Sequence, residues 1–148
     1  MKTLIINFIL MVLSISCTSV SLGNERNVES TDYPLGIKNI IVVVENGNRA
    51  SKAIIEFHHN IKNKGLSRET FHVEGYEVTR IYANNEMDES SEGKDGNYII
   101  IELNKNIGAP FTKNSKLKII QKVLITVSNG EKYKVLDKVL LNNGVIFK

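Results

Sequence analysis

Three histidines are the first candidates for chemistry in this sequence, because imidazole nitrogens are common ligands of metal ions. They are His58, His59 and His72. His58 and His59 are neighbours in a segment predicted to be a strand, so their side chains point to opposite faces and cannot bind one ion without a bulge. His72 would have to approach them across a turn. We interpret all three as surface histidines and predict neither a metal site nor a cofactor.

The segment from Asn84 to Asn97 is rich in acidic residues and lies between two predicted strands. Its carboxylates are Glu86, Asp88, Glu89, Glu92 and Asp95. Oxygen-rich loops of this kind can bind calcium, but the spacing does not follow the EF-hand series and Lys94 lies within the cluster. A solvated, mobile loop is the interpretation that we favour, since runs of charge are normally exposed.

Catalytic and phosphate-binding motifs are absent from the sequence. It contains no Gly-x-Ser-x-Gly, no His-Glu-x-x-His, no Gly-x-Gly-x-x-Gly and no P-loop. We therefore predict that this polypeptide alone is not an enzyme; an enzyme of unfamiliar type would need a cluster of perturbed acids and bases. The net charge of +3 is small and dispersed, which argues against a nucleic-acid partner.

A row of lysines lies in the C-terminal third of the chain. It consists of Lys113, Lys116, Lys118 and Lys122. At alternating positions these side chains could line one face of a strand and the loop before it. Two interpretations follow: a contact with an anionic envelope polymer or lipid head group, or protection of an edge strand against aggregation. We favour the second.

The N-terminal residues 1–16 have the layout of a secretory signal peptide. Lys2 precedes an apolar run from Leu4 to Ile15, which ends in small residues. The run is short for a membrane-spanning helix. We predict a signal peptide over residues 1–16.

Cys17 follows this run directly and is the single cysteine, so no disulfide can form within the chain. Its position resembles the acylated cysteine of bacterial lipoproteins, although Ser14 departs from the usual leucine of that pattern. The alternative is an ordinary cleaved signal. Both interpretations predict an extracytoplasmic protein, secreted or anchored to a membrane through Cys17. Residues 17–34, rich in Ser, Asn, Glu and Thr, are predicted to be a flexible tether.

From residue 35 onward the sequence predicts strand after strand. Ile37 to Val44 is β-branched and ends at an Asn-Gly turn, and the alternation that follows sends Ala53, Ile55 and Phe57 to a core and their neighbours to solvent. Hairpins are predicted around Asn129-Gly130 and Asn143-Gly144, and Ser67 could cap one short helical turn from Leu66 to Thr70. Residues 35–148 are therefore predicted to form an all-β domain, an antiparallel β-sandwich of seven to eight strands.

Two segments carry a resemblance to a known family, Ile54 to Gly75 and Gly96 to Asn114. They resemble the immunoglobulin-like N-terminal domain of bacterial secreted esterases, over roughly residues 33–130. In the first segment an apolar strand ends in an aromatic residue, and a Lys-x-x-x-Leu-Ser-x-x-Thr-Phe stretch leads into a second strand. The matching residues are Phe57, Lys62, Leu66, Ser67, Thr70, Phe71, Val73, Gly75, Asn97, Tyr98, Ile99 to Leu103, Pro110 and Phe111.

The resemblance implies an immunoglobulin-like sandwich that is attached to an α/β-hydrolase, which is missing here. The expected function is a non-catalytic accessory module that supports the orientation, substrate access or oligomerisation of a hydrolase. Its expected partners are a hydrolase domain or a second copy. Pro110 and Phe111 are the expected contact, unless Phe111 folds over the end of the sandwich. The alternative is a free-standing envelope lipoprotein or secreted binding domain with its own ligand.

Overall fold

The computed structural model describes Tyr33 and residues 36–133 and 138–148, all within the compact unit Thr31–Lys148. The predicted signal peptide, Cys17 and nearly all of the predicted tether lie outside the described residues. Across the part that is described, no helix is long and apolar enough to cross a membrane.

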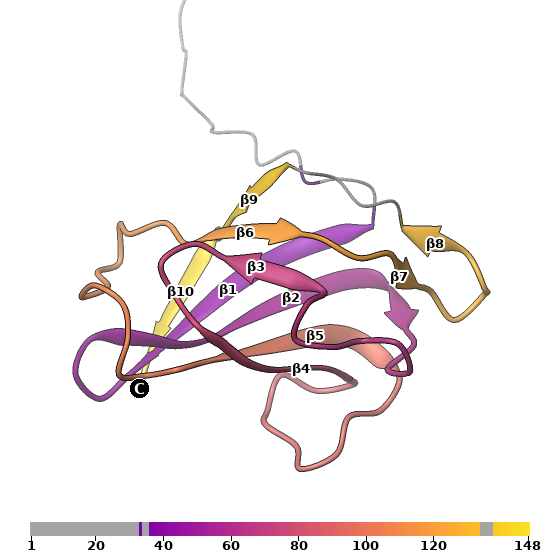
Figure 1. The fold of residues 1–148 in the computed structure, drawn as a ribbon, viewed down its shortest axis with the longest axis horizontal. Helices are drawn as coiled ribbons and strands as arrows, with labels where there is room; N and C mark the ends of the chain where they lie inside the picture. Colours follow the sequence, from indigo (N-terminus) through magenta and orange to yellow (C-terminus); the bar gives the residue numbers. More distant parts are fainter. Residues whose placement is uncertain (1–32, 34–35, 134–137) are drawn as a thin grey trace, which may run out of the picture. The chain divides into compact units, whose positions relative to one another are not determined.

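Ten strands make up the domain, in two facing sheets and one short pair (Figure 1). One sheet has the order β10-β1-β2-β5-β4, the other has the order β3-β6-β9, and β7 pairs with β8. The strands are β1 (Ile37–Glu45), β2 (Arg49–Ile61), β3 (Phe71–Val73), β4 (Val78–Asn84), β5 (Gly96–Leu103), β6 (Lys118–Gln121), β7 (Ile125–Thr126), β8 (Lys132–Tyr133), β9 (Val139–Leu141) and β10 (Gly144–Phe147). The predicted all-β, immunoglobulin-like class is confirmed. Several strands of two to four residues raise the number above the expected seven or eight.

The core lies between the two sheets and is built from alternate residues of their strands. Ile40, Ile55 and Ile101 of the five-stranded sheet are fully buried, as is Ile119 of the three-stranded sheet. Phe57 and Phe71 are the largest of the fully buried side chains. Because a chain with one cysteine cannot form an internal disulfide, burial of this apolar surface is the main source of its stability.

The hairpin of β1 and β2 follows the predicted turn. Gly47 and Asn48 both adopt positive φ angles, of 94° and 58°, a conformation that glycine and asparagine adopt more readily than other residues. Ala53, Ile55 and Phe57 face the core as predicted. Ile54 was expected to face solvent, and this is wrong. It is 2% exposed and packs with Val43, Tyr82 and Ile100 in a second cluster, on the outer face of the five-stranded sheet.

The hairpin predicted around Asn143-Gly144 does not exist, because β9 and β10 belong to different sheets. β9 pairs with β6, while β10 runs parallel to β1, with Val42 opposite Val145. The crossing is fixed by two asparagine side chains. The Oδ1 atom of Asn142 accepts from the Leu117 N–H at 2.7 Å, and that of Asn143 accepts from the Ile40 N–H at 2.9 Å. The sandwich is therefore not wholly antiparallel.

The two remaining local predictions have different outcomes. The hairpin around Asn129-Gly130 is confirmed by the antiparallel pairing of β7 and β8. The segment from Leu66 to Thr70 is a hydrogen-bonded turn and not a helix. The Thr70 N–H donates to the Ser67 carbonyl at 3.0 Å, and the Ser67 N–H donates to the Thr70 hydroxyl at 3.0 Å.

Candidate functional site

The candidate site is the end of the sandwich at which the loop between β5 and β6 lies. This loop carries Pro110 and Phe111, the expected contact residues. Phe111 is 5% exposed and belongs to the core, and its N–H donates to the Asn48 carbonyl in the turn between β1 and β2. The ring is thus not an exposed docking residue but an anchor that folds over the end of the sandwich. Pro110, which precedes it, is exposed.

Tyr76, in the turn between β3 and β4, supports the same loop from the other side. Its ring packs partly against the core, and its hydroxyl donates to the Ala109 carbonyl at 3.4 Å. Gly108 has a φ of 112°, and a Cβ atom there would lie 2.3 Å from the Tyr76 ring. The loop can pass the tyrosine only with glycine at this position. Partial burial raises the pKa of the Tyr76 phenol.

A groove of about 390 Å³ runs between the loop and the turn that carries Tyr76. It is lined by Glu74, Gly75, Tyr76, Ala109, Pro110, Phe111, Ser115, Lys116, Leu117 and Lys118. The charged side chains at its rim are already engaged, since Lys118 Nζ lies 3.5 Å from Glu74 Oε1 and Lys116 Nζ donates to the Asn142 carbonyl at 3.1 Å. The groove offers apolar surface and backbone groups for binding. Its lining contains no histidine or cysteine that could act as a base or nucleophile.

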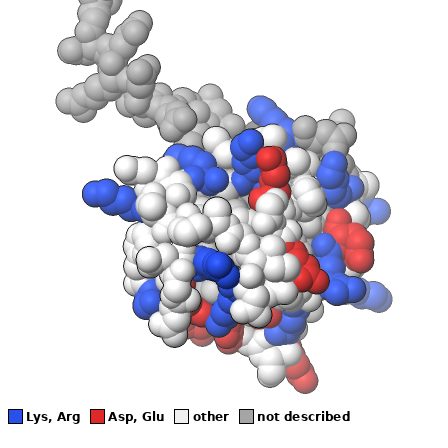
Figure 2. All heavy atoms as spheres, turned by 60° about the vertical axis from the view of Figure 1, so that its left-hand side comes forward, with Lys and Arg blue, Asp and Glu red and all other residues white. Residues whose placement is uncertain are grey.

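The surface at this end has an uncharged area with charged side chains around it (Figure 2). Figure 2 turns this end toward the viewer, and most of the central area is neither Lys or Arg nor Asp or Glu. Ile107 in the loop is 42% exposed, and Phe147 of β10 is 51% exposed. Two contacts join the elements of this end, from Arg49 to the Asn106 carbonyl at 3.1 Å and from Lys105 to Glu45 at 2.6 Å. An end that combines exposed apolar side chains with charged ones around them is suited to contact with another protein surface.

The esterase Ig-like N-terminal domain family matches the chain over residues 36–134. The chain belongs to this family. The match contains the loop, the groove and most strands of both sheets, and it stops before β9 and β10.

The solved structures give a second comparison. The chain is similar to a protein described as a thermostable esterase, with a TM-score of 0.63 and 17% sequence identity over 74% of this chain. At this identity the likeness shows the fold. The chain spans 35% of the length of that esterase. No curated protein matches the sequence significantly.

The three histidines are all exposed in this esterase Ig-like domain. His58 and His59 lie on β2 and His72 lies on β3, in different sheets. Among the residues that the structure describes, no group of three His, Cys, Asp or Glu side chains is placed to hold a metal ion.

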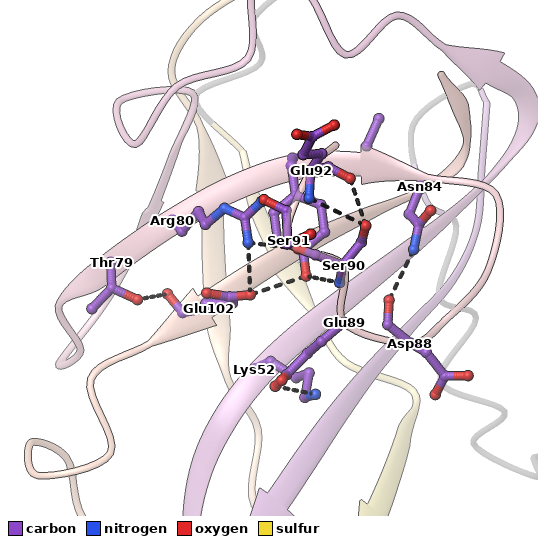
Figure 3. Close-up of polar contacts among 12 residues, drawn as sticks. Lys52, Thr79, Arg80, Asn84, Asp88, Glu89, Ser90, Ser91, Glu92 and Glu102 are labelled. Carbon is purple, nitrogen blue, oxygen red and sulfur yellow. Dashed lines mark hydrogen bonds and ion pairs between the residues drawn. The ribbon is translucent and has the colours of Figure 1, made fainter. Parts of the chain in front are cut away.

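The acidic segment between β4 and β5 folds back over the outer face of the five-stranded sheet (Figure 3). Its Met87 packs against the cluster that contains Ile54. Glu89 Oε1 accepts from Lys52 Nζ at 2.6 Å, and the Lys52 side chain is only 5% exposed. Arg80 donates to the carbonyls of Ser90 and Ser91 at 2.7 and 2.8 Å. We call residues 85–95 the acidic cover. Most of its carboxylates are exposed, as expected of a solvated loop. The expectation is wrong in one respect, because the segment is held on the sheet by the contacts of Met87, Glu89 and Arg80.

The lysine row is on the strand that the prediction required, but that strand is not at an edge. β6 lies between β3 and β9, so the favoured interpretation, protection of an edge strand, is wrong. Lys116, Lys118 and Lys122 are exposed and alternate with the buried Leu117, Ile119 and Gln121. Lys113 lies in the preceding loop.

Sequence reasoning missed Tyr76 as part of the site. The signal that could have found it is Gly108, because a loop glycine can mark a place where the backbone adopts a positive φ angle or passes close to another group. The partner of that glycine could not be read from the sequence, since 32 positions separate it from Tyr76.

Proposed function

We propose that this chain is a non-catalytic accessory module of an esterase, which docks onto a hydrolase domain through the end formed by the β5–β6 loop and β10. Membership of the esterase Ig-like N-terminal domain family supports the class of partner. The observation that carries the proposal is the construction of the loop. Phe111 holds it in the core, while Ile107 and Pro110 face outward beside the groove.

The proposed role is binding and orientation, because the groove offers no pair of groups for acid–base or nucleophilic chemistry. A hydrolase with its own Ser, Asp and His would supply catalysis. The module would set the orientation of that domain, restrict access to its active site or promote its oligomerisation. We further propose that the protein acts outside the cytoplasm, as the signal-like N-terminus suggests, with Cys17 as a possible site of lipidation.

A site-directed photo-cross-link tests the proposal. Pro110→Cys, made in a Cys17→Ala background, gives a single thiol at the groove for a benzophenone maleimide. The matched control is Lys64→Cys, since Lys64 is exposed and follows the far end of β2. Irradiation in the producing cells, followed by mass spectrometry, should identify a protein that carries a Gly-x-Ser-x-Gly motif and hydrolyses esters.

The label at Pro110 should capture this hydrolase far more efficiently than the label at Lys64. Capture of a second copy of the chain from Pro110 alone would support the oligomerisation role of the same end. Equal capture from both positions, or no hydrolase at all, would contradict the proposal. In the second case a free-standing binding domain, with its own ligand in the groove, becomes the better explanation.

A further inference from the structure

The outer face of the three-stranded sheet displays a regular row of side chains along its central strand. Lys116, Lys118, Ile120 and Lys122 share this face because they alternate with inward-facing residues. At about 3.3 Å per residue the row is about 20 Å long. We call it the β6 row.

Apolar side chains flank the β6 row on the side of β9, whereas His72 and Glu74 lie beside it on the side of β3. The pairing places His72 of β3 and Val139 of β9 opposite Ile120, and places Leu141 opposite Lys118. Val139 is 47% exposed, whereas Ile120 and Leu141 are half-buried. The face therefore combines lysines with a partly exposed apolar strip, and Figure 1 shows this sheet in front of the larger one.

Protection of a strand edge does not explain these lysines, since β6 has a neighbour on each side. The contact of Lys118 adds little stability, because its ion pair with Glu74 is half-exposed and 3.5 Å long. Lys116 donates one hydrogen bond, to the Asn142 carbonyl at 3.1 Å, and its side chain is otherwise exposed. Lysines beside an exposed apolar strip are typical of surfaces that lie on anionic lipid head groups. We propose that the β6 row and its apolar flank bind the surface of an anionic lipid bilayer.

The position of the N-terminal part of the chain agrees with this proposal. Tyr33 donates a hydrogen bond to the Leu141 carbonyl at 2.6 Å, so the chain enters the domain beside β9. Cys17 is 16 residues earlier, and a chain of that length spans at most about 55 Å. An acyl anchor at Cys17 would keep the β6 row within reach of the membrane. The proposal does not require this anchor, nor does it depend on a hydrolase partner.

A second copy of the chain is less suited than a membrane to bind this face. The complementary acidic surface is the acidic cover, which lies on the outer face of the opposite sheet. Stacking one face on the other would give a head-to-tail contact between copies. Such a contact need not close into a ring and could continue into filaments. On a membrane the same arrangement is favourable, because the acidic cover points away from the anionic surface.

Sedimentation with vesicles tests the inference on the full chain carrying Cys17→Ala, so that no acyl group contributes. One set of vesicles contains phosphatidylglycerol with phosphatidylethanolamine, and the other contains phosphatidylcholine alone. The test variant is Lys116→Glu/Lys118→Glu/Lys122→Glu. The matched control, Lys62→Glu/Lys64→Glu/Lys94→Glu, changes three exposed lysines elsewhere and has the same net charge. Any contribution of the apolar run from Leu4 to Ile15 is common to all three proteins.

The parent chain should bind the anionic vesicles more tightly than the phosphatidylcholine vesicles, and added salt should weaken this binding. Reversal of the β6 row should lower partition onto anionic vesicles by at least about tenfold, and the control by much less. An equal loss in both variants would overturn the proposal, because net charge alone would then explain it. Tight binding to soluble poly(glycerol phosphate) that displaces the vesicles would also overturn it in favour of a polymer. Circular dichroism checks that each variant is folded.

Discussion

The two outer faces of the sandwich differ in whether another segment of the chain covers them. The outer face of the five-stranded sheet carries Val43, Ile54, Tyr82 and Ile100, and the acidic cover buries them. The outer face of the three-stranded sheet carries the β6 row and has no such cover among the described residues. The comparison shows that the charge of a segment does not decide its exposure. The acidic residues close one face, whereas the apolar Val139 remains open on the other.

The largest difference between the faces should appear when an isoleucine is removed from each. Ile100 is fully buried beneath the acidic cover, so Ile100→Ala should lower the free energy of unfolding by about 2–5 kcal/mol. Ile120 is half-buried on the open face, and Ile120→Ala should cost at most about 1 kcal/mol. Urea denaturation measures both. Equal losses would show that the acidic cover does not protect its face.

The ion pair beneath the acidic cover should have the next largest effect. Glu89→Ala leaves the Lys52 ammonium buried without its carboxylate, which should cost about 1–3 kcal/mol. Adding Lys52→Met should recover most of this loss, because the buried charge is then gone. The free energies of unfolding of the single and double variants give the coupling. If the two single changes add without coupling, the pair does not hold the cover in place.

Alkaline pH should loosen the covered face through Tyr82. Burial raises the pKa of this phenol to about 12, from an unfolded value near 10. Between these values the folded protein holds the proton that the unfolded chain has lost, so stability falls as pH rises, by roughly 1 kcal/mol at pH 11. Below pH 10 the contribution is complete. Tyr82→Phe should flatten this decline in denaturation experiments, and an unchanged decline would contradict the prediction.

The smallest expected effect concerns the open face. Lys116→Glu, Lys118→Glu and Lys122→Glu should each change the free energy of unfolding by less than about 0.5 kcal/mol, because all three side chains are exposed. Thermal unfolding of the single variants measures this. A loss above about 1 kcal/mol for any of them would assign that lysine to the stability of the fold and would weaken its proposed role in membrane binding.

Local chemistry explains what could be predicted from the sequence. β-branched residues and the Asn-Gly turn predict the hairpin of β1 and β2, and alternation predicts that Ile55 and Phe57 face the core. The predictions failed where the outcome depends on a distant segment. Ile54 follows the pattern of a solvent-facing residue, and its burial comes from neighbouring strands and from Met87 of the acidic cover, which pack around it on the outer face.

The same reason accounts for the errors at β9, β10 and the candidate site. Asn143-Gly144 is an ordinary hairpin signal, yet the Asn143 side chain accepts a hydrogen bond from the N–H of Ile40, which is 103 positions away. Pro110 and Phe111 were correctly placed in one loop, but only the structure separates an exposed proline from a buried anchor. The alternation of the lysines was predicted correctly, whereas the position of β6 in the middle of its sheet depends on a strand order that alternation does not define.

The parallel pairing of β1 with β10 also has a consequence for folding. β1 ends about 100 residues before β10 begins, so one side of the first strand stays unpaired until the last strand has been made. At typical rates of synthesis this interval lasts roughly 5–20 s. Contacts so far apart in sequence also form slowly after synthesis, because a long loop has to close first. The domain is therefore expected to become stable late, with its first and last strands joining in one of the final steps.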